Sequence, residues 1–134
     1  MCKLTINSKF SEVRLAADVL HKFCQKHSIN VDTQGHLELM LVEALNNVVE
    51  HAYQESPEGS ILIAFERVDS NTIIKITDSG LSAPGTVLIE GSDLPDETIL
   101  PEGGWGLCLI QALADKIEYF RYTDHNILVL TKNS

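Results

Sequence analysis

Apolar and polar positions change their spacing several times along the chain, and each spacing predicts an element. Residues 2–8 alternate polar and apolar side chains, which is typical of a short half-buried strand. Residues 11–28 carry apolar side chains at helical spacing, and the serine that begins this range is a suitable N-cap. A second helix is expected to run from a cap at Asp32 or Thr33 to about Tyr53.

The second half of the chain is rich in β-forming runs. Two pairs of such runs are each joined by a short polar turn: residues 60–68 with 71–78, and residues 116–122 with 127–132. Between the pairs lie a long glycine- and proline-rich segment, residues 79–104, and a third predicted helix, residues 105–115. The order predicts one domain over residues 1–134, an α/β two-layer sandwich with a mixed, largely antiparallel sheet and helices on one face.

Composition excludes several classes of protein. The chain has 134 residues and a formal net charge of −9, with no dense cluster of lysine and arginine. Such a surface does not suit direct nucleic-acid binding or an anionic membrane, but it suits a basic protein partner. The three cysteines are widely spaced and predict reduced thiols in the cytoplasm, not disulfides or a zinc site. No apolar run has the length of a membrane span.

The predicted second helix carries an unusual group of polar residues. Glu43, Asn47 and His51 follow one another at i, i+4 and i+8, with Asn46 and Glu50 just to the side. The opposite half forms an apolar stripe of Leu37, Leu41, Ala44, Leu45, Val48 and Ala52. The polar group is either a solvated helix face or a site in which a carboxylate and an amide oxygen approach one hard cation.

Two further motifs bear on this choice. Asp78 ends an apolar strand and is followed by Gly80, so the carboxylate could accept a hydrogen bond from an exocyclic amine while the glycine lets a flat ring approach. An Asx-type turn explains the same residues equally well. Gly103, Gly104 and Gly106 precede the third helix, where their backbone N–H groups could bind phosphate or merely form a hinge.

Together these motifs resemble those of the GHKL ATPase superfamily. Glu43 and Asn47 with "HAY" at 51–53 are similar to its N box, Asp78 and Gly80 match the next box, and "EGGWGLCLI" looks like the last. The resemblance implies the Bergerat ATP-binding fold. Within the superfamily, the chain resembles the anti-sigma-factor serine/threonine kinases of bacterial partner-switching systems. A histidine kinase is a poorer match, because no dimerisation and phosphotransfer helix precedes these motifs.

The resemblance also implies roles for individual residues. Asn47 would coordinate the Mg²⁺ that bridges the ATP phosphates, and Glu43 would be the catalytic base. Asp78 would bind the adenine amino group, with Gly80 beneath the ring. The other residues implied to bind the nucleotide are Asn46, His51, Gly104, Gly106, Leu107 and Thr131. His51 could instead only contact a neighbouring loop.

The sequence differs from the family pattern at two places, and one further arginine matches it. Ser82 stands where the family commonly has a second glycine, and the long segment before the third helix is acidic and has no lysine or arginine. A slow kinase is therefore expected. Arg14 falls where relatives have an arginine on the partner-binding face, although a solvated arginine explains it as well.

The implied function is a Mg-ATP-dependent serine/threonine protein kinase. Its substrate would be a small anti-anti-sigma antagonist protein of the STAS type, and its second partner a sigma factor. Relatives often dimerise through their sheets, so a homodimer is compatible with the resemblance. The alternative is a partner-switching module that binds ATP without transferring phosphate and sequesters a sigma factor or another regulator.

Overall fold

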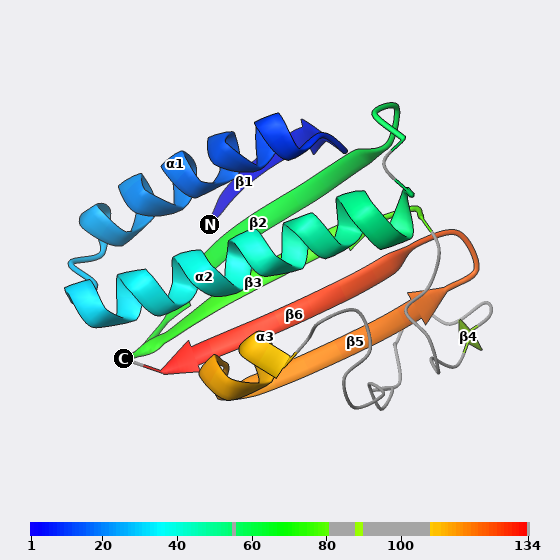
Figure 1. Ribbon diagram of the computed structural model, residues 1–134. Coiled ribbons are helices and arrows are strands. Elements are labelled where there is room, and N and C mark those ends of the chain that lie inside the picture. The colour runs from blue at the N-terminus through cyan, green and yellow to red at the C-terminus, as the bar shows by residue number, and fades with distance from the viewer. Residues whose placement is uncertain (55, 81–87, 90–107, 134) are drawn as a thin grey trace.

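The computed structural model describes residues 1–54, 56–80, 88–89 and 108–133. Its elements, in chain order, are β1 (Cys2–Asn7), α1 (Phe10–Lys26), α2 (Val31–Asn47), the π-helical turn η1 (Val48–Ala52), β2 (Ser60–Val68), β3 (Asn71–Asp78), β4 (Leu88–Ile89), α3 (Cys108–Leu113), β5 (Lys116–Tyr122) and β6 (Asn126–Asn133). The helices lie on one face of the sheet, as expected for a two-layer sandwich (Figure 1).

The sheet has the strand order β1-β2-β3-β6-β5-β4. Its pairs are antiparallel except for β4, which runs parallel to β5. The predicted mixed, largely antiparallel sheet is therefore confirmed. Strand β4 was not predicted, because a two-residue pairing within a glycine- and proline-rich segment leaves no recognisable alternation.

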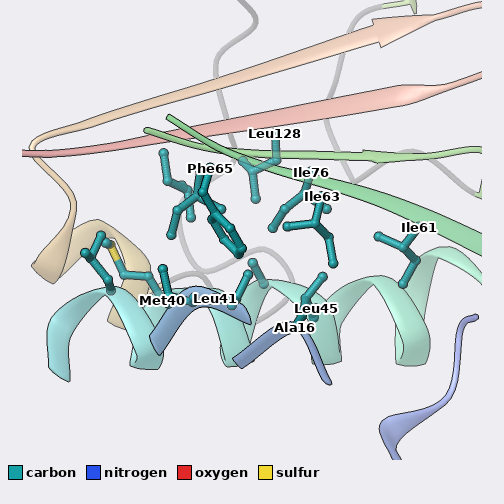
Figure 2. Close-up of a cluster of buried hydrophobic side chains, with 14 of the residues drawn as sticks. Ala16, Met40, Leu41, Leu45, Ile61, Ile63, Phe65, Ile76 and Leu128 are labelled. Carbon is teal, nitrogen blue, oxygen red and sulfur yellow. The ribbon is translucent and has the colours of Figure 1, made fainter. Parts of the chain in front are cut away.

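The core lies between the sheet and the two long helices, α1 and α2. Figure 2 shows Leu41 and Leu45 on the helix side, facing Ile63 and Phe65 of β2, and all four are 0% exposed. The whole apolar stripe predicted for this helix is buried. Its burial fixes the rotation of α2, and so decides which polar side chains can reach the end of the sheet.

Both long helices begin differently from the prediction. Helix α1 begins at Phe10 after Lys9, which makes no capping hydrogen bond, so Ser11 lies inside the first turn. Asn30 caps α2, because its side-chain oxygen accepts a hydrogen bond from the Thr33 backbone N–H at 2.8 Å. The predicted caps, Ser11, Asp32 and Thr33, were therefore wrong.

The predicted second helix widens near its end. Helix α2 ends at Asn47, and η1 continues it with the wider i→i+5 bonding of a π-helix, shown by Tyr53 N–H donating to Val48 C=O at 2.9 Å. The 100° spacing assumed for the polar face therefore fails after Asn47. His51 no longer continues the line of Glu43 and Asn47.

Within the described residues, no helix is long and apolar enough to cross a membrane.

Candidate functional site

The candidate site begins where β3 and β6 end side by side. Asp78 and Asn126 are register partners, and both are buried. Asn126 Nδ2 donates to Asp78 Oδ1 at 2.9 Å and to Gly80 C=O at 3.1 Å. Gly80 N–H also donates to Asp78 Oδ1 at 2.9 Å, which closes an Asx-type turn. Among the described residues, no hydrogen bond uses Asp78 Oδ2, so this oxygen can accept one from a ligand.

Gly80 brings this turn against the end of η1. A Cβ atom at Gly80 would lie 2.4 Å from Ala52 O and 2.6 Å from Ala52 C, both backbone atoms. No larger residue fits without a backbone shift. The glycine therefore joins the helix that carries Asn47 to the turn that carries Asp78.

Tyr53 holds the same turn from the other side. Its hydroxyl accepts a hydrogen bond from Ser79 N–H at 2.8 Å and donates one to Ser60 C=O at 2.7 Å. Burial raises the pKa of Tyr53, so the neutral phenol that makes both bonds is favoured. One side chain thus connects the end of η1, the start of β2 and the end of β3.

Burial dominates the electrostatics of Asp78. It raises the pKa of Asp78 above the ordinary aspartate value, because the charged form loses hydration. The hydrogen bonds from Asn126 and Gly80 oppose this rise, as do the positive charges of Arg121 and His125. The neighbours thus favour the carboxylate, which is the form that accepts an amine hydrogen bond at both oxygens.

Asn47 supplies the second part of the site. Its side chain is 7% exposed, and its Nδ2 atom has no hydrogen-bond partner in the part of the chain that the structure describes. A buried amide atom without a partner is costly, so the Asn47 amide is a candidate for contact with a ligand. Glu43 lies one helical turn earlier on the same side and is half-buried.

This donor set fits Mg²⁺. A half-turn of the Asn47 amide exchanges its oxygen and nitrogen, so either atom can face a ligand. One amide oxygen, with a carboxylate nearby, matches the few protein ligands that Mg²⁺ takes when substrate phosphates and water supply the rest. Within the described ranges, no cluster of three histidine, cysteine or acidic side chains could hold a metal by itself.

The structure does not bring every predicted residue to this site. Asn46 is half-buried at the flank of α2 that faces α1, and with Arg14 it lines a hollow of about 600 Å³ between the two helices. Asn46 therefore lies beside Arg14, the arginine predicted to be on the partner-binding face, and not beside Asn47 and Asp78. Adjacent residues on a helix point about 100° apart, which explains why Asn46 and Asn47 separate.

Thr131 and His51 also depart from the expectation. Thr131 pairs with Ile73, five register positions from the Asp78–Asn126 pair, so about 16 Å of strand separates it from Asp78. The structure thus does not place Thr131 beside Asp78. His51 lies 4.0 Å from Glu50 and is partly exposed. Gly103, Gly104, Gly106, Leu107 and Ser82 lie outside the described residues.

Three residues of the candidate site were not predicted from the sequence to lie there. Asn126 was assigned only to a turn, Arg121 only to a strand, and Tyr53 only to the end of the second helix and the "HAY" motif. Asn126 and Arg121 could have been found by extending the predicted hairpins, because residues that pair across strands lie at the same level of a sheet. The order of the hairpins within the sheet was the missing information.

Comparison with known proteins gives the family. The sequence matches the histidine kinase-like ATPase domain over residues 6–132, and the chain therefore belongs to this family. The predicted resemblance to the GHKL ATPases and their anti-sigma-factor kinases is thus confirmed.

Individual relatives fit this assignment. The Serine-protein kinase RsbW of Oceanobacillus iheyensis is 29% identical over 87% of this chain and 76% of that protein. The Serine-protein kinase RsbW of Halalkalibacterium halodurans is 28% identical over 97% of this chain and 81% of its own length. The Anti-sigma F factor of Heyndrickxia coagulans is 28% identical over 84% of this chain and 74% of that protein.

Solved structures confirm the fold. The crystal structure of the RsbU and RsbW domains of a Mycobacterium tuberculosis protein superposes with a TM-score of 0.66 at 16% identity, over 99% of this chain and 32% of that one. A histidine kinase domain from Erythrobacter litoralis gives 0.53 at 17% identity, over 92% and 60%.

Proposed function

We propose that the chain is a Mg-ATP-dependent serine/threonine protein kinase that phosphorylates a small antagonist protein and thereby changes its binding partner. The observation that carries this proposal is the pairing of two buried groups, the Asp78 carboxylate and the Asn47 amide, across the contact between Gly80 and Ala52. The relatives named as serine-protein kinases support the same activity.

Each residue has a role in the proposed reaction. Asp78 Oδ2 accepts a hydrogen bond from the adenine amino group and orients the nucleotide. Asn47 would hold Mg²⁺, and the ion, when bound, would neutralise charge on the phosphates. The hydroxyl oxygen of the substrate serine or threonine bonds to the γ-phosphorus of ATP, and the bond from that phosphorus to the β–γ bridging oxygen breaks. Glu43 accepts the proton that the hydroxyl loses. The released products are ADP and the phosphorylated protein.

The hollow between α1 and α2 is the proposed docking surface for the partners. Arg14, Asp18 and Glu38 give it both signs of charge, and the exposed Phe10 gives it an apolar contact. Phosphorylation adds about two negative charges to the antagonist. The kinase itself has a net charge of −9, so repulsion favours release. A sigma factor is the proposed second partner, in keeping with the relative named Anti-sigma F factor.

The experiment is a transfer assay with γ-labelled ATP, Mg²⁺ and candidate STAS-type antagonist proteins. We expect label on a serine or threonine of one antagonist, and loss of transfer in Glu43→Gln with nucleotide binding retained. Glu66→Gln is the matched control, because Glu66 lies on the sheet face away from the helices and lines a separate hollow with Lys3 and Lys75. Nucleotide-dependent complexes without label transfer would favour the binding module and contradict the kinase.

A further inference from the structure

Arg121 lies in the same cross-strand row as Asp78. It pairs with Asn126 on β6, which in turn pairs with Asp78 on β3, and the row continues to Ile61 on β2. Directly opposed residues in an antiparallel sheet project to the same face. Ile61 is completely buried in the core, so this face is the one that the helices cover. Arg121 therefore points to the side of the sheet that carries the candidate site.

The guanidinium of Arg121 is fixed by one hydrogen bond and is partly buried. Its Nη2 atom donates to Thr123 C=O at 3.2 Å, which ties the side chain to the turn between β5 and β6. Its Nη1 atom is buried and has no acceptor within residues 1–54, 56–80, 88–89 and 108–133. An arginine guanidinium stays protonated in proteins. The guanidinium is thus buried at Nη1 and tied down at Nη2, and salt screens a partly buried charge less than an exposed one.

We propose that Arg121 is a positioning residue that keeps Asp78 ionised, and that it thereby makes the site prefer a 6-aminopurine base to a 6-oxopurine base. The preference for a base rests on the proposed nucleotide binding. No ion pair joins Arg121 to Asp78 in the described structure, and two strand spacings, about 10 Å, separate their backbones. The effect acts through the electric field, across Asn126.

Other charged and titratable groups also face Asp78. His125, in the turn before β6, adds positive charge when it is protonated, and Tyr53, after η1, contacts the neighbouring Ser79. Arg121 differs from both because its charge does not change with pH. It is therefore the group whose positive charge opposes the effect of burial on Asp78 at every pH of the titration.

The base preference follows from hydrogen-bond chemistry. An ionised carboxylate only accepts hydrogen bonds, so it pairs with the amino group of adenine and repels the 6-oxo group of hypoxanthine. A protonated Asp78 could donate to that 6-oxo group. Loss of Arg121 should therefore weaken ATP binding and help ITP binding, and both effects should grow as the pH falls.

The test compares Arg121→Gln, Arg121→Lys and the control Arg67→Gln. Arg67 is an arginine on the same sheet that bonds Thr72 at the other end of β3, far from Asp78. All variants carry His125→Gln, because a histidine changes charge in the range of interest. Affinities for Mg-ATP and Mg-ITP are measured by isothermal titration calorimetry at several pH values. The range, about pH 5.5 to pH 8, extends roughly one unit or more to each side of the ordinary histidine pKa.

We expect Arg121→Gln to bind ATP about three- to tenfold more weakly than the control at the acidic end, with a smaller difference at the basic end. We expect the ITP to ATP affinity ratio to rise, and Arg121→Lys to restore most of the preference. Profiles of Arg121→Gln that coincide with those of Arg67→Gln would overturn the proposal.

A second readout separates this inference from the proposed function. The carboxyl carbon of Asp78 is titrated by NMR in the nucleotide-free protein, where Arg121→Gln should move the transition to higher pH. An unmoved transition overturns the coupling between Arg121 and Asp78 whatever the chain binds. A moved transition in a protein that binds neither nucleotide overturns the proposed function and the base preference, while the coupling stands.

Discussion

Replacing Gly80 with alanine tests the contact that joins the two halves of the site. The new Cβ would lie 2.4 Å from Ala52 O and 2.6 Å from Ala52 C. These are backbone atoms that cannot rotate away, so either the turn or the end of η1 must move. Overpacking of this kind costs about 1–3 kcal/mol. For a chain of this size, that corresponds to a fall in melting temperature of roughly 4–12 °C.

Gly35 provides the control, because it is a glycine inside α2 that has no such contact. No atom lies within 4 Å of a Cβ built at Gly35. Alanine in a helix interior is favoured over glycine by about 0.5–1 kcal/mol, so Gly35→Ala should raise the melting temperature by roughly 2–4 °C. The same chemical change is thus expected to have opposite signs at the two positions.

The assay is thermal unfolding of both variants, with and without Mg-ATP. The Gly80→Ala variant should also gain less stability from saturating nucleotide than the wild type, because the shifted turn misplaces Asp78. A Gly80→Ala protein as stable as the wild type, with equal nucleotide stabilisation, would refute the packing argument.

The remaining predictions concern single side chains. Asp78→Asn should stabilise the nucleotide-free protein at neutral pH, because burial raises the pKa of Asp78. At pH values between the ordinary and the raised pKa, the native state binds more protons than the unfolded state, so wild-type stability should fall relative to Asp78→Asn as the pH rises through that window. Urea unfolding of both proteins from acidic to neutral pH checks the sign. An advantage of Asp78→Asn in unfolding free energy that grows on acidification would contradict it. Tyr53→Phe leaves Ser79 N–H and Ser60 C=O without their shared hydroxyl, which should cost about 1–3 kcal/mol in urea unfolding, and an unchanged midpoint would argue against that link. Leu45→Ala should cost about 2–5 kcal/mol by leaving a cavity in the core, and a loss below 1 kcal/mol would mean that the core collapses around it.

The strands other than β4 were predictable because each alternates or concentrates apolar residues between polar turns. The structure has the hairpin strands within a residue of the predicted bounds at 60–68, 71–78 and 116–122. The caps and η1 were not predictable in the same way. Their geometry depends on hydrogen bonds to single backbone groups, such as Asn30 to Thr33, and not on a repeating pattern.

The site was predictable only where its residues are close in sequence. Asp78 and Gly80 form a local turn, and Asn47 follows from helix periodicity. Asn126 and Arg121 join Asp78 through the pairing of β3 with β6 and β6 with β5, which no local pattern specifies. The rotation of α2 against its core, set by residues such as Leu41 and Leu45, separated Asn46 from Asn47.

The central claim is that Asp78 and Asn47 hold a magnesium–nucleotide complex between them. Isothermal titration of ATP into the wild-type chain, Asp78→Ala and Asn47→Ala, each with Mg²⁺ or with EDTA, tests it most directly. We expect Mg-dependent binding by the wild type, greatly weakened binding by Asp78→Ala, and loss of the Mg²⁺ dependence in Asn47→Ala. Wild-type affinity and Mg²⁺ dependence retained in both variants would contradict it.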